Sequence, residues 1–261
     1  IPGTIIFCRE LPLCRPWSVY CDAHLFIRSQ RMKHVNGLSG YRSTPGHAVS
    51  FIRLDIHTFY KKQVSCFMTA ADALHTQKAI LRTNAQKQRH LAAIDYPDAA
   101  SQIADFADVV MTRFKPSIVA GFWPIHSELS PLYLMKALAQ KGCQLCLPVT
   151  GNAGTALIFR AFITETDLVD GPFKTRQPTS AAPIQCPDII LTPLLAFDRN
   201  GGRLGYGGGY YDRTFAAFTK NGKAPISVGI AYDEQEVEQV PIGPFDHRLT
   251  AILTNTSLRL A

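Results

Sequence analysis

The chain of 261 residues contains no run of about 18 consecutive apolar residues. An α-helix needs roughly 20 such residues to cross a bilayer, so we expect no membrane span. Cysteine is also sparse, with an odd total of seven and no regular spacing in the second half of the chain. This usage argues against a disulfide framework and favours a reducing, cytoplasmic location. A lone CxxC, Cys143 to Cys146, predicts buried structural thiols in preference to a metal or redox site.

Acidic residues are scarce in the first quarter of the chain. Residues 1–67 contain nine Lys or Arg but only three Asp or Glu, so most of the net charge of +7 lies there. Apolar residues in this segment follow no sustained periodicity, and prolines interrupt its early part. We expect residues 1–67 to be a disordered or non-native extension upstream of a natural start at Met68. A targeting peptide and a basic nucleic-acid-binding arm are the competing interpretations.

From Met68 onward, helix-like and strand-like segments alternate. Helices are expected over 70–94, 98–114, 130–141 and 210–220. Strands are expected over 117–123, 145–149, 156–162, 189–197, 226–232 and 251–254. These strands are apolar on both faces, which is typical of a mainly parallel sheet covered by helices on both sides. The predicted fold of residues 68–261 is one three-layer α/β domain.

Residues 201–213 form the most distinctive segment of the chain. Six of its thirteen positions are glycine, against 18 glycines in the whole sequence, and Arg203, Asp212 and Arg213 are set among them. Glycine permits positive φ, so successive backbone N–H groups can converge on an anion beside a helix N-terminus. The run follows a predicted strand and precedes a predicted helix, where ligands bind in such sheets. A phosphate site is therefore favoured over a flexible linker, which would lack fixed charges.

Several roles within this run stay open at the level of sequence. Arg203 and Arg213 are candidates to pair with phosphate oxygens, and Arg213 is equally a candidate for a solvated helix residue. Asp212 is either a Mg²⁺ ligand or a cap of the helix N-terminus. The run is not a Walker A loop, because no Gly-Lys-Ser/Thr follows it, and it lacks the spacing of a protein-kinase glycine loop.

Five segments in order resemble the 5-formyltetrahydrofolate cyclo-ligases, also called methenyltetrahydrofolate synthetases. They are Lys78 to Arg82, Trp123 to Glu128, Phe197-Asp198, Gly202 to Arg213, and Val240 to Asp246. The last departs from the familiar bacterial His-Asp pattern, because Phe245 precedes Asp246 and His247 follows it. The resemblance covers about residues 74–254 and implies an α/β fold of the NagB/RpiA/CoA-transferase type.

The resemblance implies a ligase that uses ATP and Mg²⁺ to convert 5-formyltetrahydrofolate to 5,10-methenyltetrahydrofolate, with release of ADP and phosphate. Lys78 and Arg203 would be its catalytic cations, and Asp212 and Asp246 its Mg²⁺ ligands. The residues implied to contact ATP are Lys78, Ala79, Ile80, Leu81, Arg82, Arg203, Leu204, Gly205, Tyr206, Gly207, Gly208, Gly209, Tyr210 and Tyr211. Those implied to contact the folate are Trp123, Glu128, Tyr206, Gly207, Gly208, Gly209 and Tyr210.

The side-chain chemistry suits these implied roles. A carboxylate such as Glu128 can accept from the N–H edge of a pterin, and Trp123 can cover the ring face. Lys78 and Arg82 are four residues apart and share a helix face, where two cations can neutralise a polyphosphate. Without the resemblance, Trp123 would be a core residue, Glu128 a helix cap, and the two cations an ordinary basic face.

Two other functions compete with this interpretation. One is a sugar-phosphate-handling enzyme of related fold, which would need an acid–base pair near the glycine loop but no ATP. The other is a non-catalytic nucleotide- or RNA-binding protein that uses the basic N-terminal segment. We expect a monomeric enzyme with small-molecule substrates and without nucleic-acid or membrane partners.

Overall fold

The structure is a computed structural model and describes residues 69–261. The prediction that residues 1–67 form a disordered or non-native extension lies outside the described residues. The strands of the central sheet are β1 (Ile118–Ala120), β2 (Gln144–Val149), β3 (Ile158–Ala161), β6 (Ile189–Pro193), β9 (Ile226–Ile230), β10 (Ala251–Leu253) and β11 (Leu258–Leu260). They lie in the order β11-β10-β9-β6-β1-β2-β3, with the five inner strands parallel and both edge strands antiparallel.

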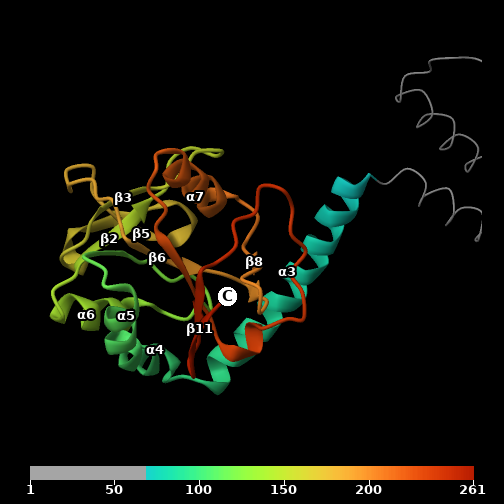
Figure 1. The fold of residues 1–261 in the computed structure, drawn as a ribbon, viewed down its shortest axis with the longest axis horizontal. Coiled ribbons are helices and arrows are strands. Elements are labelled where there is room, and N and C mark those ends of the chain that lie inside the picture. Colours follow the sequence, from blue (N-terminus) through green and yellow to red (C-terminus); the bar gives the residue numbers. More distant parts are fainter. Residues whose placement is uncertain (1–68) are drawn as a thin grey trace, which may run out of the picture. The chain divides into compact units, whose positions relative to one another are not determined.

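Helices cover both faces of this sheet. They are α3 (Ala70–Asp95), α4 (Ala99–Gln102), α5 (Ala107–Phe114), α6 (Leu132–Gln140) and α7 (Tyr210–Lys220). Figure 1 shows α4, α5 and α6 gathered on one face and α7 on the other. No helix within residues 69–261 is both long enough and apolar enough to cross a membrane.

Side chains of the inner strands alternate between two cores. Val119 and Ile189 pack in the core that includes residues of α5 and α6, whereas the next residues, Ala120 and Ile190, pack with Phe215 of α7. This alternation follows from the two-residue period of a strand. It explains why the strand segments are apolar on both faces, and the predicted three-layer α/β fold is confirmed.

Helix α3 is long and largely exposed, and its bounds agree closely with the predicted helix 70–94. It begins with a capping box, in which the Thr69 hydroxyl accepts from the Asp72 N–H and the Asp72 carboxylate accepts from the Thr69 N–H. Its buried residues are Ala85, Arg89 and Ala92, which mark one narrow stripe. Helix α3 therefore packs against the rest of the domain through this one face, which also contacts the candidate functional site.

Two predicted elements are wrong in detail. The helix expected over 98–114 is interrupted by a 3₁₀ turn, η1 (Ile103–Phe106), which packs against α6 and separates α4 from α5. Here tertiary packing overrides a continuous helical pattern. The strand expected over 189–197 ends at Pro193, which has no N–H to continue a ladder. Its last residues instead form β7 (Ala196–Phe197), which pairs with β8 (Arg203–Leu204).

Several short elements have no counterpart among the sequence predictions. They are β4 (Leu168–Asp170), β5 (Arg176–Pro178), β8, β11, η2 (Glu165–Asp167), η3 (Pro172–Lys174) and η4 (Asp233–Gln235). None is longer than three residues, so periodicity cannot reveal it. The β4–β5 hairpin contains Phe173 and Lys174, both with φ of +63°.

The CxxC cysteines are buried thiols, as predicted. Cys143 donates to the Pro116 carbonyl and Cys146 to the Val119 carbonyl, and neither forms a disulfide. Burial raises the pKa of Cys146 well above its ordinary value, which keeps that thiol protonated.

Candidate functional site

The glycine-rich run divides into a hairpin and a loop. In the hairpin, the buried Asp198 carboxylate accepts from the N–H groups of Asn200 and Gly202 at 2.9 and 2.8 Å. Its second oxygen accepts from the Val240 N–H at 2.8 Å. Asp198 thus fixes the turn that carries β8. The first part of the glycine-rich run therefore forms a hairpin. Only the loop over 205–209, which leads into α7, is a candidate to bind a ligand.

The loop over 205–209 has a backbone that requires glycine. Gly207 has φ of +101° and Gly209 has φ of +67°, which L side chains adopt only with strain. Gly209 is the N-cap of α7, and no side chain within residues 69–261 caps this helix end. The first-turn N–H groups of α7 are therefore available to an anion.

Arg213 braces this loop from within α7. Its Nη2 donates to the Gly208 carbonyl at 2.6 Å, and its Nε donates to the Thr155 carbonyl at 3.2 Å. Its guanidinium also lies over the Tyr210 ring, 5.3 Å from the ring centroid. Neither of its two candidate roles, phosphate pairing or plain solvation, describes this arrangement.

Helix α3 brings one cation to the glycine loop and a second one to Asp246. Arg82 Nε donates to the Gly205 carbonyl at 3.0 Å, and a Cβ added at Gly207 would lie 3.3 Å from the Arg82 guanidinium carbon. Lys78, one turn earlier, forms an ion pair with Asp246. Segments far apart in the sequence thus place two basic side chains, a carboxylate and the glycine loop together.

The other residues of the Lys78 to Arg82 segment lie elsewhere. Ala79 and Ile80 are exposed, with Ile80 60% accessible. Leu81 packs with Leu204 in a small apolar cluster. The structure gives Leu81 and Leu204 a packing role, and it does not bring Ala79 or Ile80 to the loop through their side chains.

Arg203 and Asp212 join the hairpin to α7. Arg203 Nη2 lies 2.6 Å from Asp212 Oδ1, and the Arg203 side chain is only 4% exposed. Arg203 Nε is buried without a hydrogen-bond partner among the described residues. The guanidinium carbon lies 5.5 Å from the centroid of the buried Tyr211 ring. An unpartnered buried donor of this kind is what a phosphate oxygen would satisfy.

Asp212 does not cap its helix through a hydrogen bond. Its Oδ1 accepts from Arg203 and, at 3.1 Å, from the His247 backbone N–H, and no α7 N–H donates to it. The helix-cap interpretation of Asp212 is therefore wrong. Asp246 Oδ2 accepts from Lys78 and from the Gly243 N–H.

The donor chemistry at these two aspartates fits a Mg²⁺ ion. Within residues 69–261, no hydrogen bond ends on Asp212 Oδ2 or on Asp246 Oδ1, so each carboxylate keeps one oxygen free. No group of three or more His, Cys, Asp or Glu side chains in this part of the chain is placed to hold a metal by itself. Magnesium bound to nucleotides commonly uses one or two carboxylates together with phosphate oxygens and water. Two aspartates suffice for that arrangement.

Glu128 forms the acidic side of the site, on the connection after β1. Its Oε2 accepts from the Ile125 N–H at 2.9 Å, and its Oε1 lies 3.6 Å from Arg89 Nη1. Burial raises the pKa of Glu128 to about 7, whereas the Ile125 N–H and the Arg89 charge lower it. Because α6 begins at Leu132 with Pro131 as its N-cap, Glu128 does not cap that helix.

Aromatic side chains line the same region. Trp123 packs partly into the main core, and the Arg176 guanidinium lies 5.3 Å from its ring centroid. Tyr206 is 40% exposed, and Phe173 of the β4–β5 hairpin is 63% exposed. Phe173 meets Tyr210 edge-on, with ring centroids 6.3 Å apart. Sequence reasoning assigned Phe173 no role, and its left-handed backbone, with φ of +63°, was not predicted either.

Arg89 is the second residue that sequence reasoning missed. It is 2% exposed and contacts Ser127, Leu194 and Tyr206. It lies among exposed polar and basic residues of α3, such as Lys87 and His90, and nothing in the sequence distinguishes it from them.

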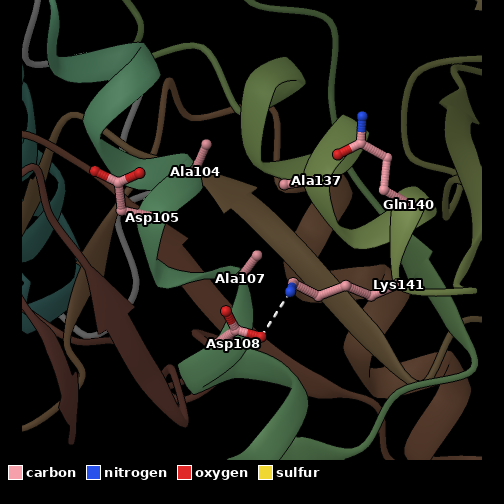
Figure 2. Close-up of a pocket in the computed structure, with 7 residues that line it drawn as sticks. All are labelled: Ala104, Asp105, Ala107, Asp108, Ala137, Gln140 and Lys141. Carbon is pink, nitrogen blue, oxygen red and sulfur yellow. Dashed lines mark hydrogen bonds and ion pairs between the residues drawn. The ribbon is translucent and has the colours of Figure 1, made fainter.

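A separate hollow lies between η1, α5 and α6 (Figure 2). Ala104, Ala107 and Ala137 lie along it, and Lys141 forms an ion pair with Asp108 at 2.6 Å at its edge. Among the described residues, its lining includes no glycine and a single cation, Lys141, which is already paired with a carboxylate. It therefore lacks the features that make the glycine loop a candidate for phosphate binding.

The fold defines an α/β protein whose candidate ligand site is built on the connections that follow parallel strands. A family model extends this description. The chain belongs to the 5-formyltetrahydrofolate cyclo-ligase family, whose model matches residues 74–255.

Individual relatives agree with this assignment. The chain is 31% identical over 187 residues to the 5-formyltetrahydrofolate cyclo-ligase of Haemophilus influenzae, covering 69% of this chain and 99% of that protein. It is 35% identical over 162 residues to the Escherichia coli K12 cyclo-ligase, covering 60% and 85% respectively. The structure of Aquifex aeolicus 5,10-methenyltetrahydrofolate synthetase shares the fold, with a TM-score of 0.59 at 24% identity over 70% of this chain and 92% of that one.

The family resemblance seen in the sequence is thus confirmed, and so is the expectation of a ligase. The two competing functions, a sugar-phosphate enzyme and a non-catalytic nucleotide- or RNA-binding protein, are not supported by these relatives. The roles of individual site residues remain predictions, as does the expectation of a monomer without nucleic-acid or membrane partners.

Proposed function

We propose that the protein uses ATP and Mg²⁺ to cyclise 5-formyltetrahydrofolate to 5,10-methenyltetrahydrofolate, releasing ADP and phosphate. The observation that carries this proposal is the contact of Arg82 with the glycine loop, because it joins two segments that family resemblance separately assigns to ATP. The Arg82–Gly205 hydrogen bond of 3.0 Å and the close approach of Arg82 to Gly207 support it.

The nucleotide side of the site would work by charge neutralisation and positioning. Lys78, Arg82 and Arg203 would meet the phosphates, together with the loop N–H groups and the N-terminus of α7. The unpartnered Arg203 Nε supports a role for this guanidinium, because a phosphate oxygen would satisfy it. Lys78 and Arg203 would act where negative charge moves during phosphoryl transfer.

Asp212 and Asp246 would hold Mg²⁺ through their free oxygens. Bound there, the ion would offset the charge of the ATP phosphates. Both aspartates are ion-paired in the structure, with Arg203 and Lys78. These ion pairs would hold the two carboxylates in place until substrate binds.

The folate side would use Glu128, Trp123 and the tyrosines of the loop. Glu128 Oε1 accepts no hydrogen bond within residues 69–261, so it is free to accept from a pterin N–H. Trp123 and Tyr206 would cover the flat rings, and Tyr210 would border both substrates. Exposed Phe173, which meets Tyr210 edge-on, extends this aromatic surface.

The formyl carbon of 5-formyltetrahydrofolate is a poor electrophile, and the proposed chemistry activates it. The formyl oxygen would attack the γ-phosphorus, ADP would leave, and the formyl carbon would become an activated imino-phosphate. N10 would then attack that carbon and lose its proton, and phosphate would depart as the five-membered ring closes. No covalent protein nucleophile is needed, so the enzyme would contribute orientation and electrostatic stabilisation.

The test is a reaction of the full-length protein with 5-formyltetrahydrofolate, ATP and Mg²⁺. We expect methenyltetrahydrofolate, followed by its absorbance, and ADP, followed by a coupled assay, to appear in equal amounts. Omission of ATP or chelation of Mg²⁺ with EDTA should abolish both signals. If neither product forms when both substrates are saturating, the proposal is wrong, and if methenyltetrahydrofolate forms without ADP, the role of ATP is wrong.

A further inference from the structure

Arg89 uses all three of its guanidinium nitrogens inside the protein. Its Nε donates to Ser127 Oγ at 3.2 Å, its Nη1 to the Leu194 carbonyl at 3.4 Å, and its Nη2 to the Tyr206 hydroxyl. The guanidinium carbon also lies 5.4 Å from the Tyr206 ring centroid. A side chain that is 2% exposed and fully engaged is fixed in one orientation.

The partners of Arg89 belong to three separate parts of the site. Ser127 adjoins Glu128 on the connection after β1, Leu194 directly follows β6, and Tyr206 belongs to the glycine loop. Buried Gln235 strengthens the centre of this cluster, because its Nε2 donates to the carbonyls of Leu194 and Leu195 at 3.0 Å each. One guanidinium on the nucleotide-side helix α3 thus fastens the folate-side segment to the loop.

Arg89 is also the buried counter-charge of Glu128. Their side chains are 2% and 5% exposed, and Nη1 lies 3.6 Å from Oε1. A charge buried without a partner is strongly disfavoured, so each of these groups depends on the other. The other titratable groups that act on Glu128 or Arg89 are Tyr206 of the loop, Tyr211 of α7 and Tyr232 after β9. All three tyrosines are neutral at physiological pH.

We propose that Arg89 is a positioning residue for the folate: it holds the Glu128 carboxyl group in place as an acceptor for the pterin and holds Tyr206 at the border between the two substrates. This inference rests on the proposed function and adds to it a residue that need not touch either substrate. Arg89 would act through Glu128 and Tyr206, so its loss should weaken folate binding more than ATP binding.

The pH dependence of folate binding separates this role from simple packing. Burial raises the pKa of Glu128 to about 7, and the Arg89 charge opposes that rise. Below this pH the carboxyl is protonated and loses acceptor capacity, so folate affinity should fall as pH falls through 7. Removing the Arg89 charge should move this transition to higher pH, whereas a packing defect would weaken binding equally at every pH.

The experiment is calorimetric titration of the full-length protein with 5-formyltetrahydrofolate, without ATP, from pH 6 to 9. For Arg89→Gln we expect the Glu128 pKa to rise by about one unit, so that the Kd rises about fivefold at pH 7, where the ionised fraction falls from about one half to about one tenth, and returns most of the way to wild type at pH 9. Arg89→Lys keeps the positive charge but not the forked donor geometry of the guanidinium. The pH midpoint of its folate binding should therefore stay near that of the wild type. Lys87→Gln removes a charge from an exposed position two residues away, and its pH profile should match the wild type.

Parallel curves for wild type and Arg89→Gln, offset by the same factor at every pH, would overturn the inference. If circular dichroism shows that Arg89→Gln does not fold, the test is instead a double-mutant cycle of Arg89→Lys and Tyr206→Phe. Non-additive effects of that pair on the folate Kd would support coupling through Tyr206, and strictly additive effects would refute it. Failure of the wild-type protein to bind 5-formyltetrahydrofolate at any pH would instead refute the proposed function itself.

Discussion

Arg203 and Asp212 are joined by an ion pair of 2.6 Å that connects the β7–β8 hairpin to the first turn of α7. The pair occupies only one side of the guanidinium, because Arg203 Nε is buried and unpartnered among the described residues. A carboxylate that grips one edge of a planar guanidinium fixes the direction of the other donors. The pair therefore orients the Arg203 guanidinium and leaves its Nε without a partner among the described residues.

Arg203→Lys should lower kcat by about 100-fold, because a lysine cannot both pair with Asp212 and keep a second fixed donor. Steady-state kinetics with ATP and 5-formyltetrahydrofolate measure the effect. Arg248→Lys is the matched control, since Arg248 is exposed and within residues 69–261 donates only to the Asn200 carbonyl. Equal and small losses in both variants would contradict a catalytic role for Arg203.

Gly207→Ala should raise the KM for ATP, because an alanine at φ of +101° is strained and its Cβ would press on the Arg82 guanidinium at 3.3 Å. The control is Gly222→Ala, which has φ of +70° and no atom within 4 Å of an added Cβ. Both variants should lose about 1 kcal/mol of unfolding free energy from backbone strain. Only Gly207→Ala should change the KM, and an unaltered KM there would argue against contact between the loop and ATP.

Glu128→Gln should change how stability depends on pH. The pKa of Glu128 is raised from 4.5 to about 7 in the folded protein, so the folded state holds the proton more tightly than the unfolded state. The resulting stabilisation is complete below pH about 4.5 and is lost as pH rises through 7. Between pH 5 and 8 the wild type should therefore lose roughly 2 to 3 kcal/mol more unfolding free energy than the variant.

Urea denaturation at several pH values measures this difference. Glu238→Gln is a suitable control, because Glu238 is exposed and its removal should leave the pH profile of the wild type unchanged. Identical pH profiles for wild type and Glu128→Gln would show that the pKa of Glu128 is not raised in the folded protein.

Asp198→Ala should destabilise the protein by about 3 kcal/mol, because three backbone N–H groups would lose a charged acceptor in a buried turn. Denaturant unfolding measures the loss, and exposed Asp170→Ala should stay within about 0.5 kcal/mol of the wild type. A small effect of Asp198→Ala on the free energy of unfolding would mean that the hairpin forms without these three hydrogen bonds.

Much of the fold was predictable because it is encoded locally. Helices α3 and α7 and the inner strands lie close to their predicted ranges, since apolar periodicity and the flanking Pro and Gly residues mark them. The errors occur where long-range packing decides, as at η1, which packs on α6, and beyond Pro193, where β7 leaves the main sheet to pair with β8.

The candidate site was likewise predictable where it is encoded locally and unpredictable where long-range packing decides. The glycine loop could be proposed from its own residue types and spacing, whereas Lys78, Arg82 and Glu128 could be proposed only from the family resemblance. Arg89 and Phe173 could not, because burial of one and exposure of the other arise only in the folded chain. The sequence also could not show that Asp212 pairs with Arg203 and makes no capping hydrogen bond to α7.

The sequence by itself determined the family, the alternating order of helices and strands, and the presence of a loop that only glycine can form. Those properties depend on residue type and short-range spacing. The tertiary structure decided which charges meet, because the ion pair of Lys78 with Asp246 spans 168 positions and the hydrogen bond of Arg89 with Tyr206 spans 117. Burial and pairing of charges arise only when the chain is packed. Packing therefore brings the nucleotide side and the folate side of the proposed site together.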